Sequence, residues 1–500
     1  MAETPNSVYA VIRDVAKEIP DKVAITFGDT VYSYAELLSL IESAAKALVA
    51  ERLGKGDRFA VYAQNTPEIL AAYFASSKIG AVMVPINPNM TAEEVTKVME
   101  HCDAGILFHD QTVTEAARAA ISSSRRRSLS ALFEGAGSPA PEERGLPDDD
   151  FAIVYTSGST GTPKAIVLSH RAQVNVLCAL AEMWGLSAQD TTVVGLPLGY
   201  LYGLSTAAAA GLASGGKLVL LRRFHPGETL AALVSSRATV FHGVPTMFTM
   251  MLEYAEQQGL HFDLSFMRAL ICAGAPLADE LKLRFEACFN MHIQNYYALS
   301  ECTPVFGKLA SNPRPMPLGV SGQLAPMAAA LIIDDQGNQC PQGEAGELLV
   351  KGAGLMTRYH NDPVNSAAVF ADGWFKTGDI ARESPPGYYT IVGRKKDIII
   401  RGGANISPPE VEAVLIEHPA VQNAAVIGLP DRIFGEVPAA AIVLRPSAEV
   451  APDELAKFAS EKLAQFKVPT KFAYLAELPL GQTGKVDKNA LRKKWEEIFK

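Results

Sequence analysis

The sequence predicts an α/β fold that is divided into at least two domains. A chain of 500 residues exceeds the roughly 250 to 300 residues at which a single hydrophobic core stops growing. Hydrophobic residues make up 48% of the chain and charged residues 20%, so large cores can be buried. Short apolar runs bounded by Gly, Pro or Asp alternate with longer helical patterns. This alternation is typical of parallel strands covered by helices.

Five apolar runs are short enough and apolar enough to be strands buried on both faces. They are RFAVYA from Arg58, GAVMVPIN from Gly80, FAIVY from Phe151, KLVLL from Lys217 and RALICAG from Arg268. A helix is predicted from Ala35, because apolar residues recur on one stripe and Ser33 with Glu36 forms a capping box. The stripe consists of Leu37, Leu38, Ile41, Ala45 and Leu48.

Two segments mark the organisation of the chain. Residues 122–147 are rich in Ser, Pro, Gly and Arg, so we expect an exposed connection in which Arg125 to Arg127 are solvated. After Arg394 the pattern changes to the strand-like AAVIGL and AAAIVL, a helix from Asp453 and a closing strand KFAYLAEL. The last hundred or so residues are therefore predicted to form a separate small α+β domain. We place the boundary at Lys396, between domains 1–395 and 396–500.

Charge and cysteine content exclude several classes of function. The net charge of −9 and the pI of about 5.6 do not favour nucleic acid as a partner, although a local site for one nucleotide stays compatible. The six cysteines form no CxxC pair, which favours a reducing compartment without structural zinc. No apolar run is long enough for a membrane helix, and we expect a cytoplasmic protein without membrane insertion. A homodimer is left open.

The most informative segment is Thr156-Ser-Gly-Ser-Thr-Gly-Thr-Pro-Lys164, directly after a predicted buried strand. Two glycines let the backbone curl and present N–H groups, while hydroxyls and one ammonium supply further donors. Such a loop suits a polyphosphate, although its spacing differs from GxxxxGK[ST]. A flexible Ser/Gly turn is the alternative that composition alone leaves open.

This loop resembles the signature of the adenylate-forming superfamily, which includes acyl- and aryl-CoA synthetases, peptide-synthetase adenylation domains and firefly-type luciferases. Further matching motifs follow in the order of the family and extend over nearly the whole chain. They are Asn295-Tyr-Tyr-Ala-Leu-Ser-Glu301, Trp374-Phe-Lys-Thr-Gly-Asp379, Gly393-Arg-Lys-Lys-Asp-Ile-Ile-Ile-Arg-Gly-Gly-Ala-Asn405 and Leu480-Gly-Gln-Thr-Gly-Lys485. The resemblance implies a large N-terminal adenylate-forming domain of mixed sheets with packed helices.

The resemblance also implies the nucleotide site. Tyr297 would stack on adenine, Ser300 would face the phosphate, and Asp379 with Arg394 would contact the ribose. Glu301 would be catalytic and would hold Mg²⁺, which prefers carboxylate oxygen. The complete implied ATP-binding set is Thr156, Ser157, Gly158, Ser159, Thr160, Gly161, Thr162, Lys164, Gly274, Ala275, Asn295, Tyr296, Tyr297, Ser300, Asp379, Arg394 and Asn405.

The small domain of the family takes two orientations, one for each half-reaction. By resemblance, Lys485 is the catalytic lysine of adenylation, because an ammonium stabilises a carboxylate that approaches an anionic phosphate. Lys396 would be the hinge. Gly402 and Gly403 would let the pantetheine arm of CoA pass close to the backbone. Glu410 follows Ser407 as a second capping box, with Pro408 at the first helical position, so its role is structural.

Walls for the acid also map onto the chain by resemblance. They are Tyr200, Tyr202, Ser205, His242, Gly243, Val244, Gly274, Ala298 and Leu299. Tyr200 occupies a gate position, and Ala298 stands where glycine is usual. His242 either lines the pocket or is a hydrogen-bonded core histidine. Residues 193–208 contain no acid, which disfavours an amino acid because its ammonium would be buried without a partner.

We therefore predict an ATP-dependent acid:CoA ligase that uses ATP, Mg²⁺ and coenzyme A. Its substrate is expected to be a neutral, small to medium aliphatic or aromatic acid. One alternative is a dicarboxylic or sulfonated acid, with Lys308 or Arg314 as a second anchor. Others are an acyl-activating enzyme that loads a carrier-protein pantetheine, and a luciferase-like oxygenase.

Overall fold

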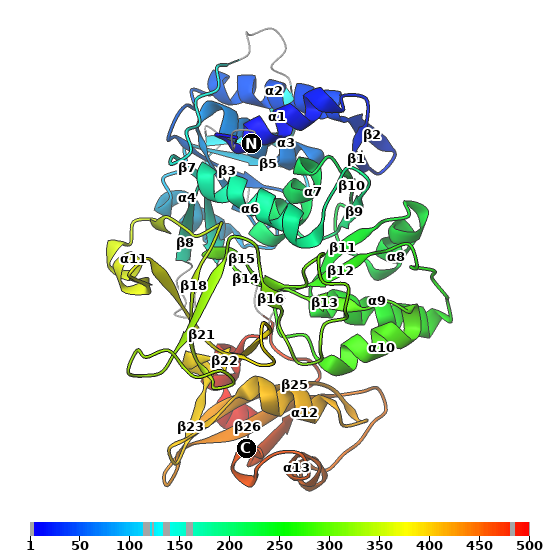
Figure 1. The fold of residues 1–500 in the computed structure, drawn as a ribbon, viewed down its shortest axis with the longest axis vertical. Coiled ribbons are helices and arrows are strands. Elements are labelled where there is room, and N and C mark those ends of the chain that lie inside the picture. The colour runs from blue at the N-terminus through cyan, green and yellow to red at the C-terminus, as the bar shows by residue number, and fades with distance from the viewer. Residues whose placement is uncertain are drawn as a thin grey trace.

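The structure is a computed structural model that describes residues 5–113, 121–122, 125–133, 141–156, 164–480 and 486–499. The N-terminal elements, in blue and green, occupy the upper part of the molecule, and the C-terminal elements, in orange and red, form a separate lower layer (Figure 1). Two seven-stranded sheets and three smaller sheets make up the described part.

Sheet A has the strand order β13-β12-β11-β9-β10-β1-β2, and all of its neighbours are parallel except β1 and β2. Its strands are β1 (Val23–Phe27), β2 (Thr30–Ser33), β9 (Thr191–Val194), β10 (Lys217–Leu220), β11 (Val240–Gly243), β12 (Ala269–Cys272) and β13 (Ile293–Asn295). The carboxyl ends of β11, β12 and β13 therefore lie at one edge, where ligands of parallel sheets commonly bind.

Sheet B has the order β19-β8-β7-β4-β3-β5-β6 and is parallel from β7 to β6. Its strands are β3 (Arg58–Tyr62), β4 (Val82–Ile86), β5 (Ile106–His109), β6 (Arg126–Ser128), β7 (Asp150–Thr156), β8 (Lys164–Ser169) and β19 (Arg358–Tyr359). Strands β7 and β8 are antiparallel, and Thr156 lies opposite Lys164. The predicted phosphate loop thus connects two residues that are paired across the sheet.

The largest hydrophobic core joins both sheets to the helices around them. Phe59 and Val61 of β3 belong to this core together with Ile25 of β1, while Ala60 and Tyr62 belong to a second core on the other face of sheet B. This alternation confirms the prediction of strands buried on both faces. The helices of this part are α1 (Val8–Glu18), α2 (Tyr34–Ala50), α3 (Pro67–Ile79), α4 (Ala92–His101), α6 (His170–Trp184), a π-helical segment Tyr202–Ala209, α7 (Ala210–Ala213), α8 (Pro226–Ser235), α9 (Pro245–Gln258) and α10 (Asp279–Phe289).

Two small antiparallel sheets follow and position much of the candidate site. Sheet C contains β14 (Tyr297–Leu299), β15 (Cys302–Gly307) and β16 (Gln323–Leu324). Sheet D contains β17 (Ala329–Ile333), β18 (Gly346–Lys351), β20 (Phe370–Ala371), β21 (Trp374–Glu383) and β22 (Tyr389–Arg394). Helix α11 (Pro363–Val369) lies between β19 and β20 in the sequence.

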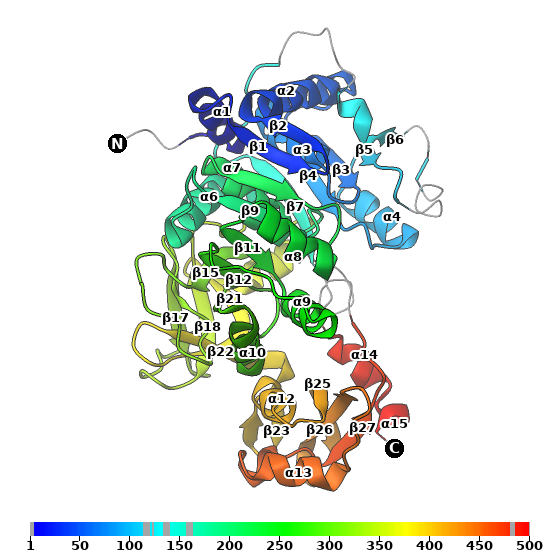
Figure 2. The same ribbon diagram turned by 90° about the vertical axis from the view of Figure 1, so that its right-hand side faces the viewer.

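The last part of the chain has its own sheet and its own cores. Sheet E contains β23 (Ile399–Arg401), β24 (Ala404–Ile406), β25 (Val421–Asp431), β26 (Gly435–Leu444) and β27 (Lys471–Tyr474). Its helices are α12 (Pro408–Ile416), α13 (Pro452–Ser460), α14 (Lys488–Lys493) and α15 (Trp495–Ile498), and Figure 2 shows them around the sheet. Two hydrophobic clusters consist only of residues from Ile399 onward. The boundary at Lys396 stays a prediction.

The structure tests the two predicted capping boxes and the predicted arginine-containing loop. The capping box of Ser33 and Glu36 at α2 is confirmed. The second capping box is wrong, because the Ser407 hydroxyl donates to the carbonyl of Val392 instead of capping α12. The expectation of solvated arginines in a loop is wrong for two of the three: Arg126–Ser128 forms edge strand β6, and Arg127 pairs with Glu51. Arg125 is exposed as expected. None of the described helices is long and apolar enough to cross a membrane.

Candidate active site

The candidate nucleotide end is built around the carboxylate of Asp379. Strands β21 and β22 place Asp379 opposite Arg394, and β14 brings Tyr297 to the same point. The Tyr297 hydroxyl donates to Oδ2 of Asp379 at 2.6 Å, and Nε of Arg394 lies 3.3 Å from Oδ1. The Asp379 side chain is 6% exposed, whereas that of Arg394 is 53% exposed. The structure thus brings three residues with predicted nucleotide roles together.

Tyr297 is also the first ring of an aromatic stack. Its ring lies 5.6 Å from Phe306 at an angle of 24°, and Phe306 lies 4.5 Å from Tyr389 at 7°. Burial, followed by the charge of Asp379, raises the pKa of the Tyr297 hydroxyl well above its usual range, so the phenol stays neutral and donates. A flat, supported aromatic face is suited to stacking on a base.

The candidate phosphate end contains a second chain of contacts. Nζ of Lys164 donates to the Tyr359 hydroxyl at 3.3 Å, and that hydroxyl donates to Oε1 of Glu301 at 3.2 Å. Lys164 also lies 4.8 Å from the centre of the Tyr359 ring. Burial and the charge of Glu301 raise the pKa of Tyr359. The sequence analysis missed Tyr359, because a single aromatic residue outside the recognised motifs carries no signal.

Several expected nucleotide contacts lie outside the described residues. These are Ser157, Gly158, Ser159, Thr160, Gly161, Thr162 and the catalytic Lys485. Of the others, Ser300 is half-buried in the turn between β14 and β15. The side-chain amide of Asn295 donates to the carbonyl of Val320 at 3.2 Å. Gly274, two residues after the end of β12, has a φ of +88° and is followed by the half-buried Ala275.

The predicted walls of the acid site gather at the carboxyl ends of β9, β11 and β12. The side-chain amide of Asn87 donates to the Tyr200 hydroxyl, and burial raises the pKa of Tyr200 to about 12. The Tyr202 hydroxyl donates to the carbonyls of Gly243 at 3.3 Å and Ile271 at 3.2 Å, so it joins two strand ends. The Ser205 hydroxyl donates to Gln173 at 2.7 Å.

His242, Tyr202 and Tyr296 belong to one aromatic cluster that also contains Trp184. The Trp184 ring lies 5.0 Å from His242 and 5.1 Å from Tyr296. His242 is 1% exposed, and burial lowers its pKa to about 3, so the imidazole is neutral. Its Nδ1 has no hydrogen-bond partner among the described residues. Whether His242 lines the acid pocket or belongs to the core stays a prediction, and the unpartnered Nδ1 favours the pocket.

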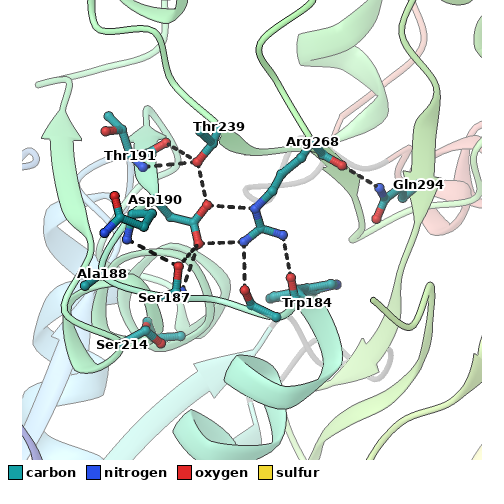
Figure 3. Close-up of polar contacts among 12 residues, drawn as sticks. Trp184, Ser187, Ala188, Asp190, Thr191, Ser214, Thr239, Arg268 and Gln294 are labelled. Carbon is teal, nitrogen blue, oxygen red and sulfur yellow. Dashed lines mark hydrogen bonds and ion pairs between the residues drawn. The ribbon is translucent and has the colours of Figure 1, made fainter. Parts of the chain in front are cut away.

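Trp184, which the sequence analysis also missed, is held by the ion pair of Arg268 and Asp190 (Figure 3). Both bonds from Arg268 to the Asp190 carboxylate are 2.7 Å long. The same guanidinium donates to the carbonyls of Trp184 at 2.5 Å and Gly185 at 3.2 Å. Arg268 therefore fixes the end of α6 to the start of β12, and with it the position of the indole.

None of the remaining wall residues that the structure describes has a charged side chain. Ala298 and Leu299 are half-buried in β14, and Val244 is half-buried after β11. Nζ of Lys308 donates to the carbonyls of Asn312 at 2.6 Å and Arg314 at 3.1 Å. Lys308 therefore stabilises its own loop, which weakens its case as an anchor for a second carboxylate. Among the described residues, no group of three or more His, Cys, Asp or Glu side chains could hold a metal.

The predicted hinge lies between two ion pairs. Lys395 pairs with Glu347 at 2.7 Å and Asp397 with Arg492 at 2.9 Å, while Lys396 between them is exposed. Gly402 and Gly403, with φ of +56° and +86°, form the turn between β23 and β24, next to the exposed Asn405. Further along, Arg445 pairs with Glu280 of α10 at 2.9 Å.

Comparison with known proteins identifies the family. The chain matches the AMP-binding enzymes over residues 12–360 and the C-terminal domain of the AMP-binding enzymes over residues 410–485. The protein therefore belongs to the AMP-binding enzymes, and its resemblance to the adenylate-forming superfamily is confirmed.

Individual relatives match along nearly the whole chain. A feruloyl-CoA synthase of an Amycolatopsis species is 32% identical over 481 residues, covering 96% of this chain and 97% of the relative. An indoleacetate–CoA ligase of Aromatoleum aromaticum is 32% identical, with 95% of each chain covered. ATP-bound MatB from Rhodopseudomonas palustris is 30% identical and covers 99% of this chain and 100% of its own, with a TM-score of 0.89. The apo form of MatB gives 0.79.

Proposed function

We propose that this enzyme joins a carboxylic acid to coenzyme A in two steps, as an AMP-forming acid:CoA ligase. In the first step a carboxylate oxygen attacks the α-phosphorus of ATP, and pyrophosphate leaves. In the second step the thiol of CoA attacks the acyl carbon, and AMP leaves with the oxygen that the acid supplied. The named activities of the relatives, feruloyl-CoA synthase and indoleacetate–CoA ligase, support the thioester as the product.

One geometric relationship carries the proposal. The contact of Tyr297 with Asp379 and that of Glu301 with Tyr359 begin at the two ends of one short segment, β14 and the turn after it. Lys164 joins the second group through its bond to the Tyr359 hydroxyl. An aromatic face and a buried carboxylate suit a nucleoside, whereas an ammonium and a second carboxylate suit phosphates with a cation. Because both groups begin on this one segment, we infer that a single nucleotide extends from Tyr297 and Asp379 to Glu301 and Lys164.

Glu301 is the residue we assign to Mg²⁺. Magnesium is commonly held by one or two carboxylates together with the phosphates of the substrate, so a cage of protein ligands is not required. The bond from the Tyr359 hydroxyl to Oε1 orients the Glu301 carboxylate. The ion would neutralise phosphate charge during attack by the acid.

The acid is proposed to be neutral apart from its reacting carboxylate. Residues 193–208 contain no acidic side chain that could pair with an ammonium. The imidazole of His242 is neutral, and the Lys308 ammonium is bound to its own loop. A second carboxylate would therefore be buried without a partner, which is unfavourable. The aromatic acids in the names of two relatives fit such a pocket.

We propose that the small domain is in the orientation for adenylation. The higher TM-score with ATP-bound MatB than with its apo form supports this arrangement. Lys485 would then reach the α-phosphate, and rotation at Lys396 would bring Gly402 and Gly403 toward the thiol. We also propose that the protein is located in the cytoplasm.

Product analysis with a panel of carboxylic acids tests the function. Acid and ATP with Mg²⁺ should release pyrophosphate before CoA is present, and AMP should follow when CoA is added. ADP as the product would contradict the proposal. Pyrophosphate release that free CoA does not convert to thioester would favour a carrier-protein acceptor, and light emission with oxygen would favour the oxygenase alternative.

A further inference from the structure

The aromatic cluster of Trp184, Tyr202, His242 and Tyr296 contains two buried polar atoms without partners. Nδ1 of His242 and the hydroxyl of Tyr296 have no hydrogen bond among the described residues. The two residues are 1% and 3% exposed. Thr206 lies close enough to lower the pKa of Tyr296, against the larger effect of burial, but not in hydrogen-bond geometry. Buried polar groups are normally paired, so two such atoms require an explanation.

Both atoms belong to the same cluster. Trp184 lies beside both rings, at 5.0 Å from His242 and 5.1 Å from Tyr296. Tyr202 also lies beside both, at 5.8 and 6.2 Å. The other phenol of the cluster is fully used, because the Tyr202 hydroxyl contacts two backbone carbonyls. The buried atoms of this cluster that lack a hydrogen-bond partner among the described residues are thus Nδ1 of His242 and the hydroxyl of Tyr296.

The cluster adjoins the proposed acid site. His242 lies in β11 one residue before its end, and Tyr296 directly follows β13. Since β11, β12 and β13 are parallel neighbours, both residues lie at the edge where ligands of such sheets bind. Tyr296 is also adjacent in sequence to Tyr297 of the nucleotide end. An acid whose carboxylate points toward the phosphates would direct its other end to this cluster.

The chemistry of the two groups limits what they can recognise. A neutral imidazole and a phenol each have a donor and an acceptor, and neither carries a charge. They match a hydroxyl or a carbonyl group, and they offer nothing to neutralise a second carboxylate.

Resting on the proposed ligase function, we propose that the acid carries a hydroxyl or carbonyl group at the end remote from its carboxylate, and that Nδ1 of His242 and the hydroxyl of Tyr296 bind this group. A site built to hydrogen-bond such a group discriminates against the analogue that lacks it, because its own polar atoms would stay unpaired. The pair therefore determines specificity. A buried water molecule on the same atoms is the competing explanation.

Matched pairs of acids test this assignment. Benzoate with 3- and 4-hydroxybenzoate, phenylacetate with 4-hydroxyphenylacetate, and hexanoate with 6-hydroxyhexanoate would be compared by kcat/KM for pyrophosphate release. At least one hydroxylated acid should exceed its parent by about tenfold or more, in line with one well-made hydrogen bond. Tyr296→Phe and His242→Leu should each reduce that ratio about tenfold.

Tyr62→Phe is the matched control, because it removes a buried hydroxyl that donates to Met90 at 2.7 Å in another core; its ratio should equal that of the wild type. Turnover of parent and hydroxylated acids at equal efficiency in the wild type would overturn this inference while leaving the ligase function intact. Variants that slow both members of a pair equally, with melting temperatures preserved, would favour the water. If no acid released pyrophosphate, the proposed function itself would be wrong.

Discussion

The hydroxyl of Tyr297 and the carboxylate of Asp379 are 2.6 Å apart, although 82 residues separate them in the chain. This bond fixes one carboxylate oxygen of Asp379, while Arg394 lies against the other. The aromatic platform and the carboxylate therefore have a fixed relative position. Such preorganisation reduces the cost of ordering side chains around a ligand.

Replacing Tyr297 by Phe should separate the platform from its hydrogen bond. The ring would still stack on Phe306, but Asp379 would lose a donor, and we expect KM for ATP to rise about three- to tenfold, as for one hydrogen bond to a charged group. ATP titration of pyrophosphate release checks this. Tyr389→Phe is the control, since it keeps the stack and leaves Asp379 unchanged. An unaltered KM in Tyr297→Phe would mean that Asp379 needs no help from the phenol.

Tyr359→Phe should raise the Mg²⁺ concentration required for activity. The change removes the donor to Oε1 of Glu301 and the acceptor for Lys164, so the carboxylate loses its orientation. Loss of a partner that orients a metal ligand typically weakens binding by about 10- to 100-fold, and we expect the lower end. A Mg²⁺ titration measures it, with Tyr474→Phe in the small domain as the control. Equal Mg²⁺ dependence of wild type and Tyr359→Phe would contradict the assignment of Glu301 as a Mg²⁺ ligand.

Much of the large-scale fold could be predicted because burial on both faces leaves a strong signal in short strands. The runs from Arg58 and Gly80 became β3 and β4. Capping was less reliable: Ser33 caps its own helix, but Ser407 uses its hydroxyl on Val392, which comes from a distant strand. A local pattern cannot show such a competing tertiary partner.

Residues of the candidate site could be predicted only where they belong to a recognised motif. Tyr297, Asp379, Arg394 and Glu301 were found through the resemblance, and their contacts agree with a common site. Trp184 and Tyr359 were not found, because each acts through neighbours that become close only after folding. The specific environment of His242 likewise depends on two rings from other elements, Trp184 and Tyr202.

The pair of Arg268 and Asp190 should give stability with a defined pH dependence. Burial raises the pKa of Asp190, but the bonds from Arg268 and Thr239 outweigh it and lower the pKa overall. The pair therefore stabilises the fold above the usual Asp value of about 3.9, and this contribution is lost as pH falls through the lower folded pKa. Arg268→Leu should cost about 2 to 3 kcal/mol at pH 7, reduced from a fully buried pair by its partial exposure.

Urea unfolding at several pH values measures this cost. The difference between Arg268→Leu and wild type should shrink as pH falls from about 4 through the lowered folded pKa of Asp190, because the carboxylate is then protonated in both proteins. Arg284→Leu is the control, since it breaks the more exposed pair with Glu256 and a longer contact with Glu280, and it should cost less than about 1 kcal/mol. A deficit independent of pH would assign the effect to packing rather than to the ion pair.

The two half-reactions should be separable by changing Lys485 and Lys396. An ammonium about 4 Å from a developing charge is worth up to about 4 kcal/mol, so Lys485→Ala should slow adenylation by up to about a thousandfold yet still convert a supplied acyl-adenylate to thioester. Lys396→Pro should slow the thioester step selectively, because proline restricts φ at the hinge. Rates of each half-reaction check this. Equal loss of both in two folded variants would contradict the rotation.

The most direct test of the account follows the oxygen atoms of the acid. Adenylation joins a carboxylate oxygen to the α-phosphorus, and thiol attack then breaks the bond between that oxygen and the acyl carbon. When the acid is labelled with ¹⁸O in both carboxylate positions, the account predicts one ¹⁸O in the AMP formed with the thioester, measured by mass spectrometry. Unlabelled AMP, or label in inorganic phosphate with ADP as the other product, would contradict the acyl-adenylate and with it the proposed ligase mechanism.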